Sequence, residues 1–150
     1  MIVRVQAETF DAGREMAALA EGRHDIGALA SFTGLVRDRP DGNRLIALTL
    51  EHYPGMTERQ LEAIAAEAER RWPLQACLIV HRIGRMLPGE PIVLVATASA
   101  HRAAALDACA FLMDWLKTQA PFWKLEEVEG EEPVWVEARA ADDRAADRWR

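Results

Sequence analysis

The chain has 150 residues, of which 50% are hydrophobic and 28% charged, and this suits one globular domain with a substantial core. Its net charge of −6 argues against bulk nucleic-acid binding, which needs a basic face, but a local cluster of donors can still bind an anionic small molecule. No stretch resembles a transmembrane span or a signal peptide, so we expect a single cytoplasmic domain over residues 1–150.

The predicted elements of the first half mix strands and helices. In chain order they are a strand over 2–5, a weak helix over 11–20, a strand over 26–36, a polar turn over 37–43 and a strand over 45–53. Thr57 is predicted to cap the next helix, with Gln60 completing a capping box. The predicted buried stripe of this helix is Leu61, Ile64, Ala65, Ala68 and Trp72.

The second half begins after Pro73, which is expected to end that helix. Two apolar strands over 76–83 and 92–98 are predicted next, joined as a hairpin. Ser99 is expected to cap a helix over 100–118 that is apolar almost all round, including Leu106, and so buried on more than one side. The remaining predictions are strands over 122–126 and 134–138 and a polar end that frays or forms a short helix. This order predicts an α+β fold.

Cysteine and glycine patterns exclude several kinds of chemistry. Cys77 and Cys109 lie in apolar stretches and are interpreted as buried, unreactive residues. There is no zinc-type spacing, no Walker loop and no GxGxxG motif, so no metal or cofactor is expected.

Lysine use is the most unusual feature of the composition. Only Lys117 and Lys124 are lysines, against sixteen arginines, and they flank the segment Thr118–Trp123. Arginine stays charged, whereas a buried lysine can lose its proton and act as a base, an acid or a nucleophile. The pair indicates either a need for amines at this place or a compositional bias that left two lysines by chance.

Periodicity places each lysine on a face with other side chains. Lys117 extends the helical stripe of Leu106, Ala110 and Met113, so its amine either reaches water along its stem or sits at the lip of a pocket. On a strand, Lys124 would share one face with Phe122 and Glu126, as a pocket wall or as an exposed edge with an ion pair.

Candidate anion-binding residues lie elsewhere in the chain. His101 and Arg102 stand in the first turn of the predicted helix, where free N–H groups favour an anion, although they also fit an ordinary surface pair. Arg37 ends a mostly apolar strand. Arg102 and Lys117 are separated by about 22 Å along a continuous helix. If both serve one small ligand, the site must be shared between two chains of a two-fold dimer.

Six segments together resemble the catalytic subunit family of molybdopterin synthase. They occur in the family's order and cover nearly the whole chain. The matching segments are Phe32–Arg37 (FTGLVR), Leu48–Glu58 (LTLEHYPGMTE), His81–Gly84 (HRIG), Ser99–Arg102 (SAHR), Met113–Lys124 (MDWLKTQAPFWK) and Trp135–Arg139 (WVEAR).

The resemblance implies a fold, a reaction and partners. The fold would be of the α/β-hammerhead type with additional antiparallel strands. The reaction would be sulfur transfer from the thiocarboxylated C-terminal glycine of a small ubiquitin-like subunit to cyclic pyranopterin monophosphate, which gives the dithiolene of molybdopterin. The assembly would be a heterotetramer with a central dimer of large subunits. Buried cysteines suit this reaction because the partner brings the sulfur.

Residue roles also follow from the resemblance. Lys117 is expected to be the principal catalytic residue and Lys124 to assist, with Glu126 orienting it. Residues that suit the phosphate of the substrate are Arg37, His101, Arg102 and Arg139. Phe32, Leu35 and Met113 complete the expected substrate-binding set. The family often carries basic residues where Leu35 and Leu125 stand, so contacts at these positions are expected from the backbone.

Two other hypotheses remain open from the sequence. In the first, Lys117 forms a Schiff base with a phosphorylated carbonyl compound. In the second, the chain is a dimeric domain that only binds a small partner.

Overall fold

The computed structural model describes residues 1–136 and 140–150. The strands are β1 (Ile2–Gln6), β2 (Ala28–Leu35), β3 (Leu45–His52), β4 (Leu74–Arg82), β5 (Gly84–Met86), β6 (Pro91–Ser99), β7 (Phe122–Val128) and β8 (Val134–Val136). The helices are α1 (Ala12–Ala20), α2 (Met56–Arg71), α3 (Arg102–Gln119) and α4 (Ala140–Asp147). The α+β class is thus confirmed, and no helix in the described ranges is long and apolar enough to cross a membrane.

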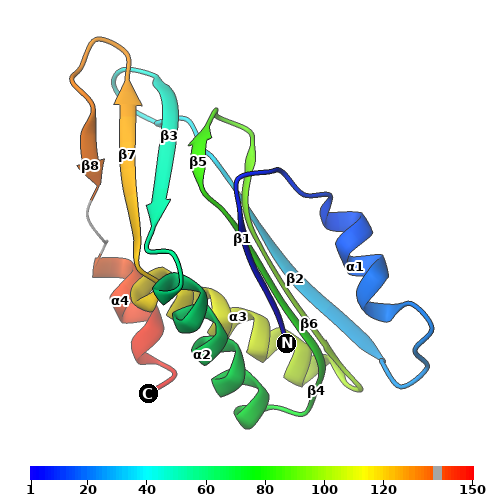
Figure 1. Ribbon diagram of the computed structural model, residues 1–150. Helices are drawn as coiled ribbons and strands as arrows, with labels where there is room; N and C mark the ends of the chain where they lie inside the picture. Colours follow the sequence, from blue (N-terminus) through cyan, green and yellow to red (C-terminus); the bar gives the residue numbers. More distant parts are fainter. Residues whose placement is uncertain (137–139) are drawn as a thin grey trace.

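The larger sheet has the strand order β1-β4-β6-β2 and is covered by helices on both faces (Figure 1). β1 pairs with β4 in parallel, and the other two pairings are antiparallel. Side chains of Leu78, Val80, Leu94 and Ala96 pack toward α1, while the opposite face packs on α2 and α3. Because both faces of the sheet are covered, the sequences of β4 and β6 are nearly continuous apolar runs.

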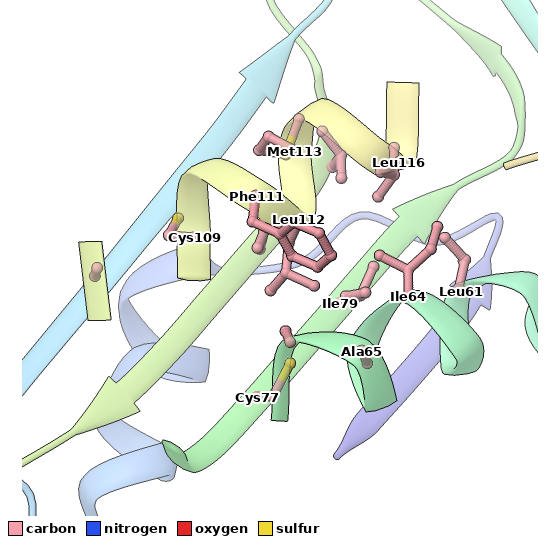
Figure 2. Packing of buried hydrophobic residues seen from close by; sticks show 14 of the residues in the cluster. Leu61, Ile64, Ala65, Cys77, Ile79, Cys109, Phe111, Leu112, Met113 and Leu116 are labelled. Atoms are coloured by element: carbon pink, nitrogen blue, oxygen red, sulfur yellow. The ribbon is translucent and has the colours of Figure 1, made fainter. Parts of the chain in front are cut away.

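The main core lies between this sheet and the helices α2 and α3 (Figure 2). Phe111 and Leu112 of α3 point toward Ile64 of α2 and Ile79 of β4, and all four are at most 2% exposed. The predicted stripe of α2 is buried, except that Trp72 is only partly covered. Burial raises the pKa of Cys77 to about 12 and that of Cys109 to about 11, which agrees with unreactive thiols.

The helix α3 is buried on several sides, as expected, because it contacts β2, β6, α2 and α4. Leu106 is an exception, since 60% of it is exposed. Ser99 was expected to cap this helix, but it is the last residue of β6 and donates its hydroxyl hydrogen to the carbonyl of Pro73. His101 is the N-cap instead.

The start of α2 also differs from the prediction. Gly55 is the N-cap, with φ of 85°, and its N–H is bound by the carboxylate of Glu58. Thr57 lies one residue inside the helix and is fully buried. Its hydroxyl accepts a hydrogen bond from the Tyr53 N–H and donates one to the carbonyl of Pro121. Thr57 therefore ties the start of α2 to the turn between α3 and β7, which a local capping pattern does not reveal.

The smaller sheet has the order β5-β3-β7-β8 and stands beside the helical layer (Figure 1). The predicted hairpin link between β4 and β6 contains β5, which leaves the larger sheet and pairs with β3. Gly84 begins this departure with φ of 88°, a backbone conformation that glycine adopts easily. The expected strand over 134–138 is β8 as far as Val136, and residues 137–138 lie outside the described residues.

Candidate functional site

The chain's two lysines line one cavity of about 150 Å³. It lies where the main core meets the smaller apolar cluster under β3, and Ile92 packs against both. The lining comes from β3, β4, β6, the end of α3 and the start of β7. Its residues are Leu48, Leu50, His81, Ile92, Leu116, Lys117, Thr118, Ala120, Phe122 and Lys124.

A tight connection between helix and strand brings the lysines to this cavity. Lys117 lies in the last turn of α3, which ends when the Ala120 N–H donates to the carbonyl of Leu116. Pro121 stops the helix, and β7 begins at once with Phe122. The Thr57 hydroxyl donates a hydrogen bond to the carbonyl of Pro121, which fixes this turn to the start of α2. Of the two readings of Lys117, the structure matches the lip of a pocket, because the residue is exposed and also lines the cavity.

Lys124 faces an apolar wall. It is half-buried and stands opposite Leu50 in the register of β7 and β3. Phe122 and Lys124 both line the cavity, as their shared strand face predicted. Trp123 between them points elsewhere and lines a second hollow with Glu51, His52, Tyr53 and Trp135. A half-buried amine beside apolar side chains is less exposed to water than a surface lysine, which strengthens its interaction with an anion.

His81 also lines the cavity, although no role in the site was predicted for it. It is 5% exposed and stacks on Phe122 with ring centroids 3.9 Å apart. Its Nδ1 is 2.9 Å from the carbonyl oxygen of Arg82. Burial is the main cause that lowers the pKa of His81 to about 4, and Lys117, Lys124 and His52 lower it further, against the hydrogen bond to Arg82. The imidazole is therefore neutral at pH 7.

This lowered pKa makes stability depend on pH. Between pH 6.5 and 4, the unfolded chain binds a proton at His81 that the folded chain does not, so stability falls as pH falls through this window. The loss amounts to about 3 kcal/mol for the 2.5-unit difference. We expect His81→Phe to show a correspondingly smaller loss between pH 7 and 4 in urea unfolding. Because both chains share every other titrating group, parallel curves would contradict the assignment.

The expected anion-binding residues of α3 lie at the other end of the helix. His101 and Arg102 are exposed and do not line the described cavity. The helix is unbroken from Arg102 to Gln119, so the length argument holds, at about 22 Å between Arg102 and Lys117. One chain therefore does not bring these residues together with the lysines.

The expected residues of β2 and its end lie closer but outside the lining. Phe32 is 42% and Leu35 56% exposed, and Arg37 is exposed after the strand. Leu35 pairs with Pro91, the neighbour of the lining residue Ile92, so the end of β2 lies at the cavity end of the larger sheet. Gly34 packs closely on the side chain of Val93 rather than leaving open space.

The other expected residues have different surroundings. Met113 is 8% exposed in the main core, one helical turn before Lys117. Glu126 is half-buried on β7, opposite Leu48 and Val134, and does not line the cavity. Arg139 lies outside the described residues.

The fold and the cavity define an α+β protein that presents two amines in one cavity lined by both apolar and polar side chains. Comparisons with known proteins identify its family. The family model described as MoaE protein matches residues 5–119. The molybdopterin synthase catalytic subunit of Pseudomonas aeruginosa is 57% identical and is covered over 99% of both chains. The chain belongs to the MoaE family.

Solved structures show the same fold. The molybdopterin cofactor biosynthesis protein E of Burkholderia multivorans is 53% identical, with a TM-score of 0.83 over 99% of this chain and 95% of that one. Molybdopterin synthase of Staphylococcus aureus is 30% identical, with a TM-score of 0.82 over 89% of this chain and 96% of that one.

Proposed function

We propose that this chain is the catalytic subunit of a molybdopterin synthase. It takes sulfur from the thiocarboxylated C-terminus of a small ubiquitin-like subunit and transfers it to cyclic pyranopterin monophosphate, giving the dithiolene of molybdopterin. The main support for the proposal is that Lys117 and Lys124 line the same cavity in a chain of the MoaE family. Residues 1–150 act as one unit, in the cytoplasm.

The shape of the cavity suits the tail of such a partner. A C-terminal Gly-Gly thiocarboxylate carries no side chains, so it is thin enough for a space of about 150 Å³. The leucines of β3 exclude water, and the two ammonium groups attract the anionic end. Positive charge that is already in place stabilises negative charge as it develops on the reacting oxygen.

The chemistry needs no sulfur from this chain, in keeping with its buried cysteines. The thiocarboxylate sulfur attacks a side-chain carbon of the pterin precursor, and a carbon–oxygen bond breaks as the carbon–sulfur bond forms. A protonated lysine gives its proton to the departing oxygen. Water then hydrolyses the resulting thioester, which leaves sulfur on the pterin and a carboxylate on the small subunit. A second transfer completes the dithiolene.

The phosphate of the precursor is held by residues outside the described cavity. We assign this role to Arg37 and Arg139 and, from a second copy of the chain, to His101 and Arg102. Phe32, Leu35 and Met113 bind the rest of the substrate, and Glu126 orients Lys124. The support is geometric, because α3 is too long for Arg102 to reach a ligand at Lys117 of its own chain. The functional assembly is then a heterotetramer around a central homodimer.

Reconstitution tests the proposal. The purified chain, a thiocarboxylated small subunit and cyclic pyranopterin monophosphate should yield a product with two added sulfurs, measured by mass spectrometry. The control is the same small subunit ending in a carboxylate, which should yield none because no sulfur is available. The absence of sulfur-bearing product with the thiocarboxylated partner would contradict the proposed function.

A further inference from the structure

The tautomer of His81 follows from its one hydrogen bond. Its Nδ1 lies 2.9 Å from the carbonyl oxygen of Arg82, and a carbonyl oxygen only accepts. Nδ1 therefore carries the hydrogen. In the neutral ring, the lone pair is then on Nε2. The stacking on Phe122 at an interplanar angle of 19° fixes the plane of the ring, so the direction of this lone pair is fixed as well.

The Nε2 atom of His81 has no hydrogen-bond donor among the described residues. Among the described side chains, the buried polar atoms without a partner are Nε of Arg4, Oε1 of Gln75 and Nε1 of Trp115, and Nε2 of His81 is not one of them. The nitrogen thus keeps a small accessible surface, and His81 shares its cavity with both lysines.

Ionisable groups from three other elements act on this ring. Lys117 of α3, Lys124 of β7 and His52 of β3 all disfavour its protonation, and Arg82 follows it on its own strand. A carboxylate at this place would neutralise one ammonium group. A neutral imidazole accepts a hydrogen bond and leaves both positive charges available to an anionic ligand.

The Lys117 side chain has no other polar partner among the described residues. It lies in the last turn of α3 and, within residues 1–136 and 140–150, forms no hydrogen bond or ion pair. A lysine side chain has four rotatable bonds, so a free ammonium group samples many positions. Catalysis needs the group in one place, and small misplacements cost rate.

We propose that His81 is a positioning residue for Lys117: its Nε2 accepts a hydrogen bond from the ammonium group and holds it over the cavity. This inference rests on the proposed function of Lys117. The interaction places the amine without removing its charge, so the substrate anion and the small-subunit tail meet a fixed donor. His81 itself does not touch the reacting atoms.

Two substitutions separate this role from packing. In both His81→Phe and His81→Gln the Nδ1–H bond to Arg82 is lost, so they share that defect. Phenylalanine keeps the stacking on Phe122 but has no acceptor, whereas the glutamine side-chain oxygen can take the place of Nε2. We expect H81F to lower the single-turnover rate of sulfur transfer about tenfold or more, with substrate affinity unchanged, and H81Q to recover most of the rate.

A double substitution tests whether the effect passes through Lys117. In a Lys117→Ala background, adding H81F should lower the rate no further, because the group that it positions is already absent. Equal losses in H81F and H81Q, or a full additional loss in the Lys117→Ala background, would overturn the proposal. If H81F fails to fold, His81→Asn replaces it, since its amide can still donate to Arg82 but offers no acceptor at Nε2.

A measurement without turnover separates this inference from the proposed function. With only two lysines, the ¹⁵N side-chain spectrum has two ammonium signals, and Lys117→Ala identifies them. Protons of the Lys117 ammonium group should exchange with water more slowly in wild type and H81Q than in H81F. Slow exchange without sulfur transfer would refute the function and keep the contact. If sulfur transfer is observed but the Lys117 ammonium protons exchange equally fast in all three proteins, the contact with His81 is refuted and the proposed function is not.

Discussion

Replacing Lys117 by alanine is expected to lower the rate of sulfur transfer by a factor of about 100 to 1000. This is the usual effect of removing one pre-placed donor that stabilises a developing negative charge. Lys117 lines the cavity at the end of α3, where the tail of the small subunit would enter. The rate is measured in a single turnover, with the thiocarboxylated small subunit and the precursor both in excess over their dissociation constants.

The matched control for this substitution is Gln119→Ala. Gln119 is exposed in the same last turn of α3 and does not line the cavity, so its loss should leave the rate unchanged. Thermal unfolding of both variants should stay close to wild type, since Lys117 is exposed and forms no ion pair within the described part of the chain. A Lys117→Ala chain with wild-type rate would refute the catalytic assignment. Borohydride trapping of substrate on Lys117 would favour Schiff-base chemistry instead.

The sequence predicts most elements of this fold because the relevant signals are local. The apolar runs of β4 and β6, the proline after α3 and the stripe of α2 each determine structure within one segment. The predictions are wrong where a residue far away in the sequence determines the local structure. Thr57 looks like a cap, but its hydroxyl binds Pro121, 64 residues away. Gly84–Met86 looks like a hairpin link, but it pairs with β3 in another sheet.

The same distinction applies to the site. The two lysines stand out in the sequence because all other Lys or Arg positions are arginine. They line one cavity because a single turn joins the end of α3 to the start of β7. His81 carries no such local signal. Its neutral state depends on burial against Phe122 and on the charges of Lys117 and Lys124, and its tautomer depends on the carbonyl of Arg82. Its place in the segment His81–Gly84, which resembles the family, was the only sequence feature that pointed to it.

Equal mixing of an Arg102→Ala chain with a Lys117→Ala chain is expected to restore about a quarter of wild-type activity, although each variant alone is nearly inactive. In a shared site, Arg102 comes from one chain and Lys117 from the other. Random pairing makes about half of the dimers mixed, and each mixed dimer has one intact site out of two. The two chains are co-expressed with different tags, and sulfur transfer is measured for the mixture and for the purified mixed dimer.

The purified mixed dimer gives the sharper result, because its one intact site should provide about half of wild-type activity per dimer. A mixed dimer of Arg102→Ala with Gln119→Ala is the matched control. It retains one site with both Arg102 and Lys117, so it should also reach about half. If the first mixed dimer is inactive while the control is active, the two residues act within one chain or in different sites. The unbroken 18-residue helix α3 argues against the first of these alternatives, since it holds the residues at opposite ends.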